Sequence, residues 1–416
     1  MRGRIMESSV DKILSKIEQL EAEAVELMKS LIGINSIGPK NDGPGEGEKA
    51  WFLKNYLEGK GFKKVENYPA PDPTVADGQR PNLVTVLPGK NRAKTLWIIT
   101  HTDVVPPGDL SKWSTDPFVP VVKDGKIYGR GSEDNLQGLV SSVMMARAFI
   151  ESGIEPEFNI GLVMVADEET GSVFGLNYLI KNHSDLFKQN DLIIIPDAGL
   201  PDGSMIEVAE KSIVWIKFKT LGRQVHASVP NLGVNAFRAA SNLVVKLDEL
   251  HSIYNAVDPI FEPAISTFEP TKKEANVPNI NTLPGDDVFY LDCRILPEYD
   301  VEEVMQSVRK MADAIEKEFR VKTEITTEQK EQAAPATRVD ASIVAVLKDA
   351  VKKVYHIDAK AQGIGGGTVA AFFRRRGFPV VVWSALDDLA HQANEYCKIS
   401  NLINDAKVFA RCVMQK

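Results

Sequence analysis

Four short runs in the first half of the chain are apolar at almost every position, and they constrain the fold more than any other feature. They are NLVTVL (82–87), TLWIIT (95–100), FNIGLVMVA (158–166) and DLIIIPDAG (191–199). Strands with one exposed face alternate polar and apolar residues, so runs that are apolar on both faces predict strands covered on both sides. A helical pattern over residues 136–152 separates two of the runs. We therefore expect an α/β fold with a central sheet between helices.

The pattern changes near residue 212. Helices are indicated by residues 233–250 and 301–319, and strands with one exposed face by four alternating stretches, SIVWIKFKTLG, AISTFEPTK, DDVFYLDCRIL and VKTEITTE. Their order, βαββαβ, predicts a small α+β domain with helices on one face of its sheet. The buried-strand pattern returns with PVVVWSAL, and 416 residues exceed the usual size of one core. The expected domains are a catalytic domain of residues 1–211 and 329–416 and an inserted domain of residues 212–328.

Charge and composition exclude several classes of function. The net charge is −8 and the pI is about 5.5, which argues against a nucleic-acid partner because binding phosphates requires a basic face. No apolar run reaches the roughly 20 residues of a membrane helix, and the N-terminus has helical apolar spacing in place of a signal-peptide core. The cysteines, Cys293, Cys397 and Cys412, have no metal-type spacing and predict neither disulfides nor a cysteine zinc site. We expect a cytoplasmic protein.

Acidic residues and histidines follow the predicted strands. Since ligands in α/β sheets bind beyond the carboxyl ends of strands, these side chains are expected at one functional edge. Each alone has a structural explanation, such as a helix N-cap or a solvated turn. Together, their carboxylates would repel one another unless divalent cations lay between them. The residues are His101, Asp103, Asp134, Asp167, Glu168, Glu169, Asp197 and His391.

The number of candidate ligands favours two ions. Zinc takes about four ligands. Five of these residues are candidate ligands, which suffices for two ions if Asp134 bridges them: His101, Asp134, Glu169, Asp197 and His391. Glu168 is then free to act as a general base, because adjacent residues in an extended segment cannot both face one metal. Asp103 lies two residues from His101 on the same strand face and is expected to orient its imidazole. A zinc exopeptidase with a single metal is the alternative.

Nine motifs resemble, in the same order along the chain, those of the M20 family of co-catalytic metallopeptidases, which includes aminoacylases, desuccinylases and dipeptidases. They are HTDVVP, WSTDPF, GRGSEDNLQG, DEETGS, PDAG, GRQVHASVPNLGVNA, LDCRILP, GIGGGT and HQANE. The resemblance implies a zinc-exopeptidase-like catalytic domain with a central mixed sheet and an inserted lid and dimerisation domain. It also implies His101 and Asp197 on one metal, Glu169 and His391 on the other, Asp134 as the bridge and Glu168 as the base.

The resemblance assigns further roles to the inserted domain. His226, in QVHASVP, corresponds to a histidine that enters the partner subunit's site to stabilise the oxyanion; the alternative is that it caps a strand end. Arg294, in LDCRILP, corresponds to an arginine that binds a substrate carboxylate; the alternative is a pair with Asp292. Other substrate contacts implied by the resemblance are Asn281 and the glycine turn with Gly366, Gly367 and Thr368.

The expected function is hydrolysis of small N-acyl amino acids or short peptides by a homodimer with two divalent ions. Zinc is the expected metal, with cobalt and manganese as alternatives. Desuccinylase-like members follow the glycine turn with a Ser-Asp-Ala-Arg type of segment, whereas this chain has GGGTVAAFFR. This departure argues against a desuccinylase, and the segment resembles the dipeptidase branch more closely. The alternatives to the expected function are a succinyl-diaminopimelate desuccinylase, an acetylornithine deacetylase, or a non-catalytic metal-binding homologue.

Overall fold

The computed structural model describes residues 2–415, which divide into two compact units. Unit 1 comprises Met1–Val208, Thr337–Ala361 and Phe372–Lys416, and unit 2 comprises Ala209–Ala336 and Gln362–Ala371. The inserted segment is thus longer at both ends than the expected 212–328. The glycine turn after residue 364, which the sequence analysis assigned to the catalytic domain, belongs to unit 2.

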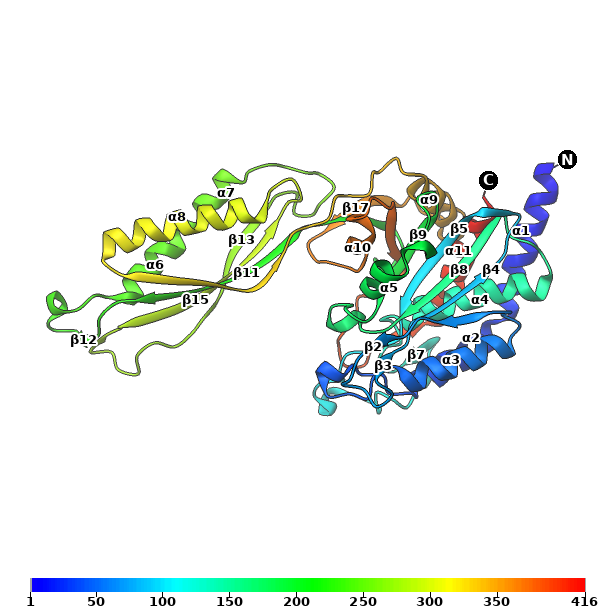
Figure 1. Ribbon diagram of the computed structural model, residues 1–416, viewed down its shortest axis with the longest axis horizontal. Helices are drawn as coiled ribbons and strands as arrows, with labels where there is room; N and C mark the ends of the chain where they lie inside the picture. Colours follow the sequence, from blue (N-terminus) through cyan, green and yellow to red (C-terminus); the bar gives the residue numbers. More distant parts are fainter. Residues whose placement is uncertain (1, 416) are drawn as a thin grey trace. The chain divides into compact units, whose positions relative to one another are not determined.

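An eight-stranded mixed sheet forms the centre of unit 1 (Figure 1). Strands β8, β5, β9 and β18 run parallel. Strands β1 and β4 are antiparallel to their neighbours, and β10 is antiparallel to β18. This confirms the expected central mixed sheet. The order is β1 (Val65–Asn67), β4 (Leu83–Leu87), β8 (Phe158–Val165), β5 (Asn91–His101), β9 (Leu192–Gly199), β18 (Val380–Ser384), β10 (Met205–Glu210) and β17 (Lys360–Ile364).

Helices cover the sheet because each has an apolar stripe to bury. Helix α4 (Leu136–Ser152) spans the predicted residues and packs on β5, β8 and β9, and α11 (Ile399–Met414) packs on α4. The helical apolar spacing at the N-terminus forms two helices that meet at Leu20, and the buried apolar positions continue across the break. The other helices are α1 (Arg2–Gln19), α2 (Glu21–Ile32), α3 (Gly47–Gly59), α5 (Leu176–Asn182), α9 (Ser342–Tyr355) and α10 (Ala370–Arg374).

Strand register brings the carboxyl ends of the parallel strands to one edge. His101, the last residue of β5, pairs with Val165 of β8, and Ser384 of β18 pairs with Gly199 of β9. The loops that follow these strands therefore start side by side. Two small sheets complete unit 1, formed by β19 (Tyr396–Lys398), β7 (Lys126–Tyr128) and β6 (Val121–Lys123), and by β2 (Ala70–Pro71) and β3 (Gln79–Arg80).

Unit 2 has the predicted βαββαβ order, which confirms the inserted α+β fold. Its antiparallel sheet buries alternate residues such as Val214, Ile216 and Phe218 under the helices, whereas Trp215 is 41% exposed. The sheet order is β13 (Thr267–Lys273), β15 (Asp286–Ile295), β11 (Ser212–Leu221) and β16 (Lys322–Glu331), with helices α6 (Ala236–Leu247), α7 (Glu249–Ile253) and α8 (Val301–Phe319). A two-stranded ribbon pairs β12 (Val225–His226) with β14 (Thr282–Leu283).

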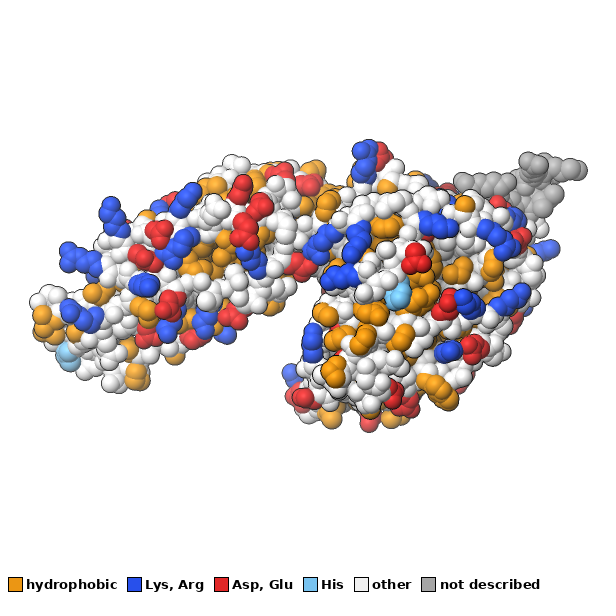
Figure 2. Space-filling model, in the orientation of Figure 1, with side chains coloured by type: hydrophobic (Ala, Val, Ile, Leu, Met, Phe, Trp, Pro, Cys, Tyr) orange, Lys and Arg blue, Asp and Glu red, His pale blue; other side chains and the backbone are white. Residues whose placement is uncertain are grey.

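Charge is not segregated by sign on the visible surface. Figure 2 shows acidic and basic side chains intermixed over both units on one face, with hydrophobic side chains between them. Within residues 2–415, no helix combines the length and the apolar character needed to span a bilayer.

Candidate metal centre

Five candidate ligands meet at the carboxyl edge of the unit 1 sheet. His101 ends β5, Asp197 lies near the end of β9, and Asp134 lies in the turn before α4. Glu169 lies in a short 3-10 turn, Glu168–Thr170, that follows β8. His391 comes from the loop between β18 and β19.

The ligands form two groups that share one carboxylate. In the first group, His101 Nε2 lies 3.0 Å from Asp134 Oδ1 and 3.4 Å from Asp197 Oδ1. In the second, His391 Nε2 lies 3.3 Å from Asp134 Oδ2 and 3.0 Å from Glu169 Oε2. The two oxygens of Asp134 thus face different histidines.

The electrostatics of both groups fit divalent cations. Although burial alone would have the opposite effect, the three acidic neighbours of His101 hold its pKa well above the usual range. Hydrogen bonds to Asp134 and Glu169 raise the pKa of His391 to about 10. Burial alone would raise the pKa of Asp134, but hydrogen bonds from the two histidines hold it well below its usual range. Both imidazoles therefore occupy positions where the carboxylates attract positive charge.

The carboxylate of Glu169 provides a second test of whether these residues fit a metal ion. Its Oε1 is buried and has no hydrogen-bond partner among the described residues. Burial, followed by the charge of Asp134, raises the pKa of the Glu169 carboxyl to about 7. A buried oxygen without a donor is costly, and a cation at this point would remove the cost. The imidazole and carboxylate donors are those that zinc accepts.

Asp103 contacts both His101 and the turn that carries the glutamates. The nearest contact of His101 Nδ1 is the backbone carbonyl of Asp103 at 3.0 Å, and the Asp103 carboxylate lies 3.4 Å away. That carboxylate accepts the N–H groups of Glu168 and Glu169, each at 3.1 Å. The sequence predicted that Asp103 orients the imidazole but did not indicate its contact with the turn.

Glu168 has the properties of an acid–base group. Burial, together with the nearby charge of Asp197, raises the pKa of the Glu168 carboxyl well above its usual range. It belongs to neither candidate ligand group. A carboxyl with a raised pKa can both accept and return a proton near neutral pH.

Buried charged residues lie next to the Glu168–Thr170 turn, and one of them binds its N-cap residue, Asp167. Arg80 pairs with Glu46, and Glu46 Oε1 accepts the N–H of Asp167 at 3.2 Å. Burial lowers the pKa of Lys49 to about 8, although the charges of Asp103, Glu46 and Glu395 oppose this shift. Glu46, Lys49 and Arg80 could not be predicted from the sequence, because none of them lies within the nine motifs.

Two motif residues, Glu133 and Glu395, were also missed. Both are buried, at 3% and 0% exposure, and both accept backbone N–H groups from a ligand-bearing loop. The available signal was the acidic residue beside Asp134 in GSEDN and the one that ends HQANE.

Unit 2 brings His226 and Asn281 together. The exposed His226 pairs with Thr282 on the β12–β14 ribbon, and its Nδ1 contacts Ser228 Oγ at 2.7 Å. The next residue, Ala227, donates its N–H to the Asn281 carbonyl at 2.8 Å.

Arg294 lies beside the glycine turn of unit 2. Its Nε and Nη2 bind the Asp292 carboxylate at 2.7 and 3.1 Å, as in the alternative considered from the sequence, and its Nη1 binds the Gly365 carbonyl at 2.9 Å. The turn continues through Gly366 and Gly367 to Thr368, whose N–H binds Glu210 at 2.9 Å. A Cβ added at Gly366 would meet no described heavy atom within 4 Å.

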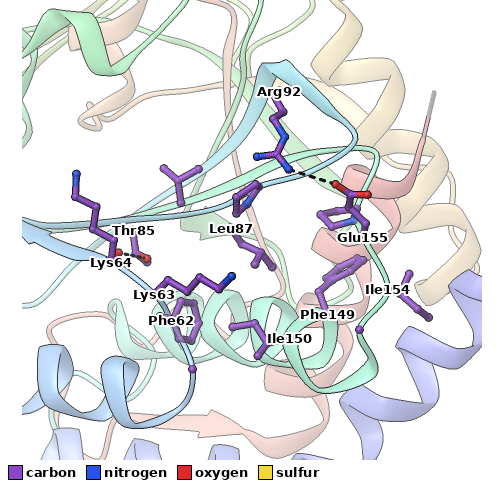
Figure 3. Close-up of a pocket in the computed structure, with 15 residues that line it drawn as sticks. Phe62, Lys63, Lys64, Thr85, Leu87, Arg92, Phe149, Ile150, Ile154 and Glu155 are labelled. Carbon is purple, nitrogen blue, oxygen red and sulfur yellow. Dashed lines mark hydrogen bonds and ion pairs between the residues drawn. The ribbon is translucent and has the colours of Figure 1, made fainter.

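A separate pocket lies at the other end of the unit 1 sheet. Its volume is about 520 Å³, and it is lined by Phe62, Leu87, Phe149 and Ile154, with an Arg92–Glu155 ion pair at its rim (Figure 3). Leu87 pairs with Ile160, near the start of β8, whereas the candidate ligands follow the end of that strand. The pocket includes none of the candidate ligands.

Comparisons with known proteins give consistent matches. The model of peptidase family M20/M25/M40 matches residues 97–415. An uncharacterised metallohydrolase of Methanococcus maripaludis is 44% identical over 407 residues, covering 93% of this chain and 97% of the relative. Another, of Methanocaldococcus jannaschii, is 45% identical over 401 residues, covering 93% and 98%. A succinyl-diaminopimelate desuccinylase of Polynucleobacter necessarius is 24% identical over 395 residues, covering 94% and 98%.

Solved structures match the fold over nearly the whole chain. Human carnosine dipeptidase 1 has a TM-score of 0.72 at 18% identity, covering 97% of this chain and 98% of that structure. The aminopeptidase PepT of Bacillus cereus has a TM-score of 0.74 at 20% identity, covering 95% and 98%. At these identities the likeness extends to the fold alone.

Proposed function

The chain belongs to peptidase family M20/M25/M40 and is a metal-dependent hydrolase, and from this premise we propose that it is a cytoplasmic two-metal amidohydrolase. The match to the family model confirms the resemblance to the M20 family that the nine motifs indicated. Its proposed substrates are small N-acyl amino acids or short peptides, which it cleaves at an amide bond. Relatives and structural neighbours named as desuccinylases and dipeptidases support a small substrate.

The observation that carries the proposal is the shared position of Asp134. Its Oδ1 lies 3.0 Å from one histidine and its Oδ2 lies 3.3 Å from the other, which supports a carboxylate bridge between two ions. His101 and Asp197 would hold one ion, and Glu169 and His391 the other. The four carboxylates of Asp134, Glu168, Glu169 and Asp197 would balance the charge of two divalent cations, with zinc as the proposed metal and cobalt or manganese as alternatives.

Glu168 is the proposed proton carrier. When bound, the ions would polarise the amide carbonyl and lower the pKa of the attacking water. Glu168 takes a proton from that water as its oxygen attacks the carbonyl carbon. It then donates the proton to the leaving nitrogen as the carbon–nitrogen bond breaks. Asp103 keeps Glu168 in place by holding the backbone of its turn at 3.1 Å.

Residues of unit 2 are proposed to bind the substrate. Arg294 would bind a substrate carboxylate through its Nη1, which carries a second N–H besides the one bound to Gly365. The open space at Gly366 supports close approach of a ligand to the backbone there. Gly367, Thr368 and Asn281 are the other proposed contacts. His226 is proposed to stabilise the oxyanion in the partner subunit of a homodimer.

A hydrolysis screen tests the proposal. Metal-free protein is reloaded with zinc, cobalt or manganese, and N-acyl amino acids and dipeptides are tested, including succinyl-diaminopimelate and acetylornithine. We expect activity that requires two ions per chain and falls by about 10²- to 10⁴-fold in the Glu168→Gln variant. Full activity at one ion per chain would favour the single-metal exopeptidase, and no hydrolysis with both ions bound would favour a non-catalytic homologue.

A further inference from the structure

Two ligand-bearing loops of unit 1 are tied to each other by a reciprocal pair of buried carboxylates. One loop, residues 130–134, ends in Asp134, and the other, residues 385–395, carries His391. We propose that Glu133 and Glu395 are positioning residues that hold these loops together and thereby set Asp134 and His391 at the spacing of the second ion. This inference rests on the proposed two-metal site. We refer to the pair as the Glu133–Glu395 clasp.

Glu395 holds the first loop. Its Oε1 accepts the N–H groups of Glu133 and Asp134 at 2.8 and 3.1 Å, and its Oε2 accepts the Gly131 N–H at 2.9 Å. The guanidinium of Arg130 adds a charged hydrogen bond at 2.7 Å. Four donors thus surround one fully buried carboxylate, and three of them are the backbone of the turn that presents Asp134.

Glu133 holds the second loop in the opposite direction. Its Oε1 accepts the N–H of Asp387 at 2.6 Å, and its Oε2 accepts the N–H of Leu389. Both donors precede His391 by only a few residues. Each loop therefore supplies the carboxylate that binds the backbone of the other, although more than 250 residues separate the partners.

The second loop needs such support because its backbone is unfavourable by itself. Asp388, His391 and Asn394 have φ values of 61°, 64° and 62°, in the left-handed region that residues other than glycine adopt at a cost in free energy, although Asp, His and Asn do so more often than the rest. Such conformations persist only where surrounding contacts determine them. The hydrogen bonds from Asp387 and Leu389 to Glu133 flank Asp388 on both sides.

The two halves of the clasp differ in what they position. Glu395 holds the turn of Asp134, which belongs to both candidate groups, whereas Glu133 holds only the loop of His391, which belongs to one. Loss of a residue that orients a metal ligand typically weakens metal affinity about 10- to 100-fold. Glu133→Gln should therefore weaken one ion, and Glu395→Gln should weaken both.

Metal titration of the metal-free protein tests this difference. Zinc and cobalt binding are followed by calorimetry and by the cobalt absorption spectrum, so hydrolytic activity is not the readout. Asp191→Asn is the matched control, because Asp191 is equally buried and accepts the N–H groups of Thr95, Trp97 and Lys188 at 2.8 Å, at the other end of β9. We expect the control to lower stability and leave both affinities within about threefold of wild type.

Two results would overturn the clasp. In the first, both glutamine variants bind both ions with wild-type affinity. In the second, their loss of affinity is no larger than that of the Asp191→Asn control. The double variant gives a further test, since both residues join the same two loops. We expect its loss to be smaller than the product of the single losses, and independent losses would contradict the coupling.

Hydrogen exchange of the wild-type protein covers the case in which a variant does not fold. The amides of Gly131, Glu133, Asp134, Asp387 and Leu389 should exchange slowly even without metal, because carboxylates bind them directly. Rapid exchange that slows only when metal is added would show that the ions, not the clasp, order the loops. If the protein hydrolyses no amide, the proposed function is wrong, but the hydrogen-exchange measurement still tests the clasp.

Discussion

Asp103 Oδ1 accepts a hydrogen bond from the backbone N–H of Glu168 at 3.1 Å, although 65 residues separate them. Oδ2 of the same carboxylate binds the N–H of Glu169. One side chain in the loop just after β5 thus positions both the proposed base and a proposed ligand. The same carboxylate lies 3.4 Å from His101 Nδ1. Its removal therefore tests whether it acts on the turn of Glu168 and Glu169 or on the imidazole of His101.

We predict that Asp103→Ala lowers kcat and weakens the ion held by Glu169 more than the ion held by His101 and Asp197. The physical reason is that the two backbone N–H groups of the turn lose their acceptor, whereas His101 keeps the Asp103 carbonyl at 3.0 Å. Each effect should be about 10- to 100-fold. Calorimetric titration distinguishes the ions, and a selective loss of the His101-bound ion would mean that the carboxylate acts through the imidazole.

We predict that Glu168→Gln retains both ions and lowers kcat by about 10²- to 10⁴-fold, the usual contribution of general acid–base catalysis. Glutamine has nearly the same shape but cannot accept the proton. Metal content by atomic emission and kcat by a steady-state assay are the measurements. If the variant loses an ion and keeps its activity per remaining ion, the roles of Glu168 and Glu169 are reversed.

Asp134→Ala should abolish tight binding of both ions together. Its two oxygens face different groups, and its removal leaves fewer carboxylates to offset each cation. Stepwise titration with zinc measures the effect, with Asp191→Asn as the control for general destabilisation. One ion still binding at wild-type strength would exclude the bridge.

Metal binding should release protons at neutral pH, and affinity should rise with pH. In the absence of metal, hydrogen bonds to Asp134 and Glu169 raise the pKa of His391 to about 10, and the pKa of His101 is also raised. Both imidazoles must lose a proton to bind a metal. For the metal-free fold, the raised pKa of His391 contributes stability that is fully present below about pH 6.5 and is lost as pH rises through about 10.

Calorimetry of zinc binding at pH 7 in buffers of different ionisation enthalpy measures this proton release. The heat should vary with the buffer in proportion to the protons released. In His391→Gln, the release should fall by about one proton per chain. A heat that does not depend on the buffer would show that the imidazoles are already neutral.

We predict that His226 completes the site of the partner subunit in a twofold dimer. His226→Ala should lower kcat by about 10²- to 10³-fold without changing metal affinity. Subunits of His226→Ala and Glu168→Gln are mixed after dissociation, so that each mixed dimer has one site with both defects and one with neither. Activity should reappear in the mixture, and its absence despite subunit exchange would mean that His226 acts within its own chain or not at all.

Local patterns predicted most of the fold. Helix α4 and helix α8 have the predicted bounds, because apolar periodicity is a property of neighbouring residues. The break at Leu20 and the inclusion of Gln362–Ala371 in unit 2 were not predicted. Both depend on packing between segments, which the local pattern does not contain.

By itself, the sequence determined which residues follow the buried strands and therefore which histidines and carboxylates share one sheet edge. Register and loop packing decided what each of these carboxylates contacts. Asp103 binds the turn after β8, and the two oxygens of Asp134 face two histidines from different parts of the chain. Likewise, Glu133 and Glu395 each accept backbone N–H groups from the loop that carries the other. A hydrogen bond depends on positions within a few tenths of an ångström, and for residues hundreds of positions apart only the folded chain sets those positions.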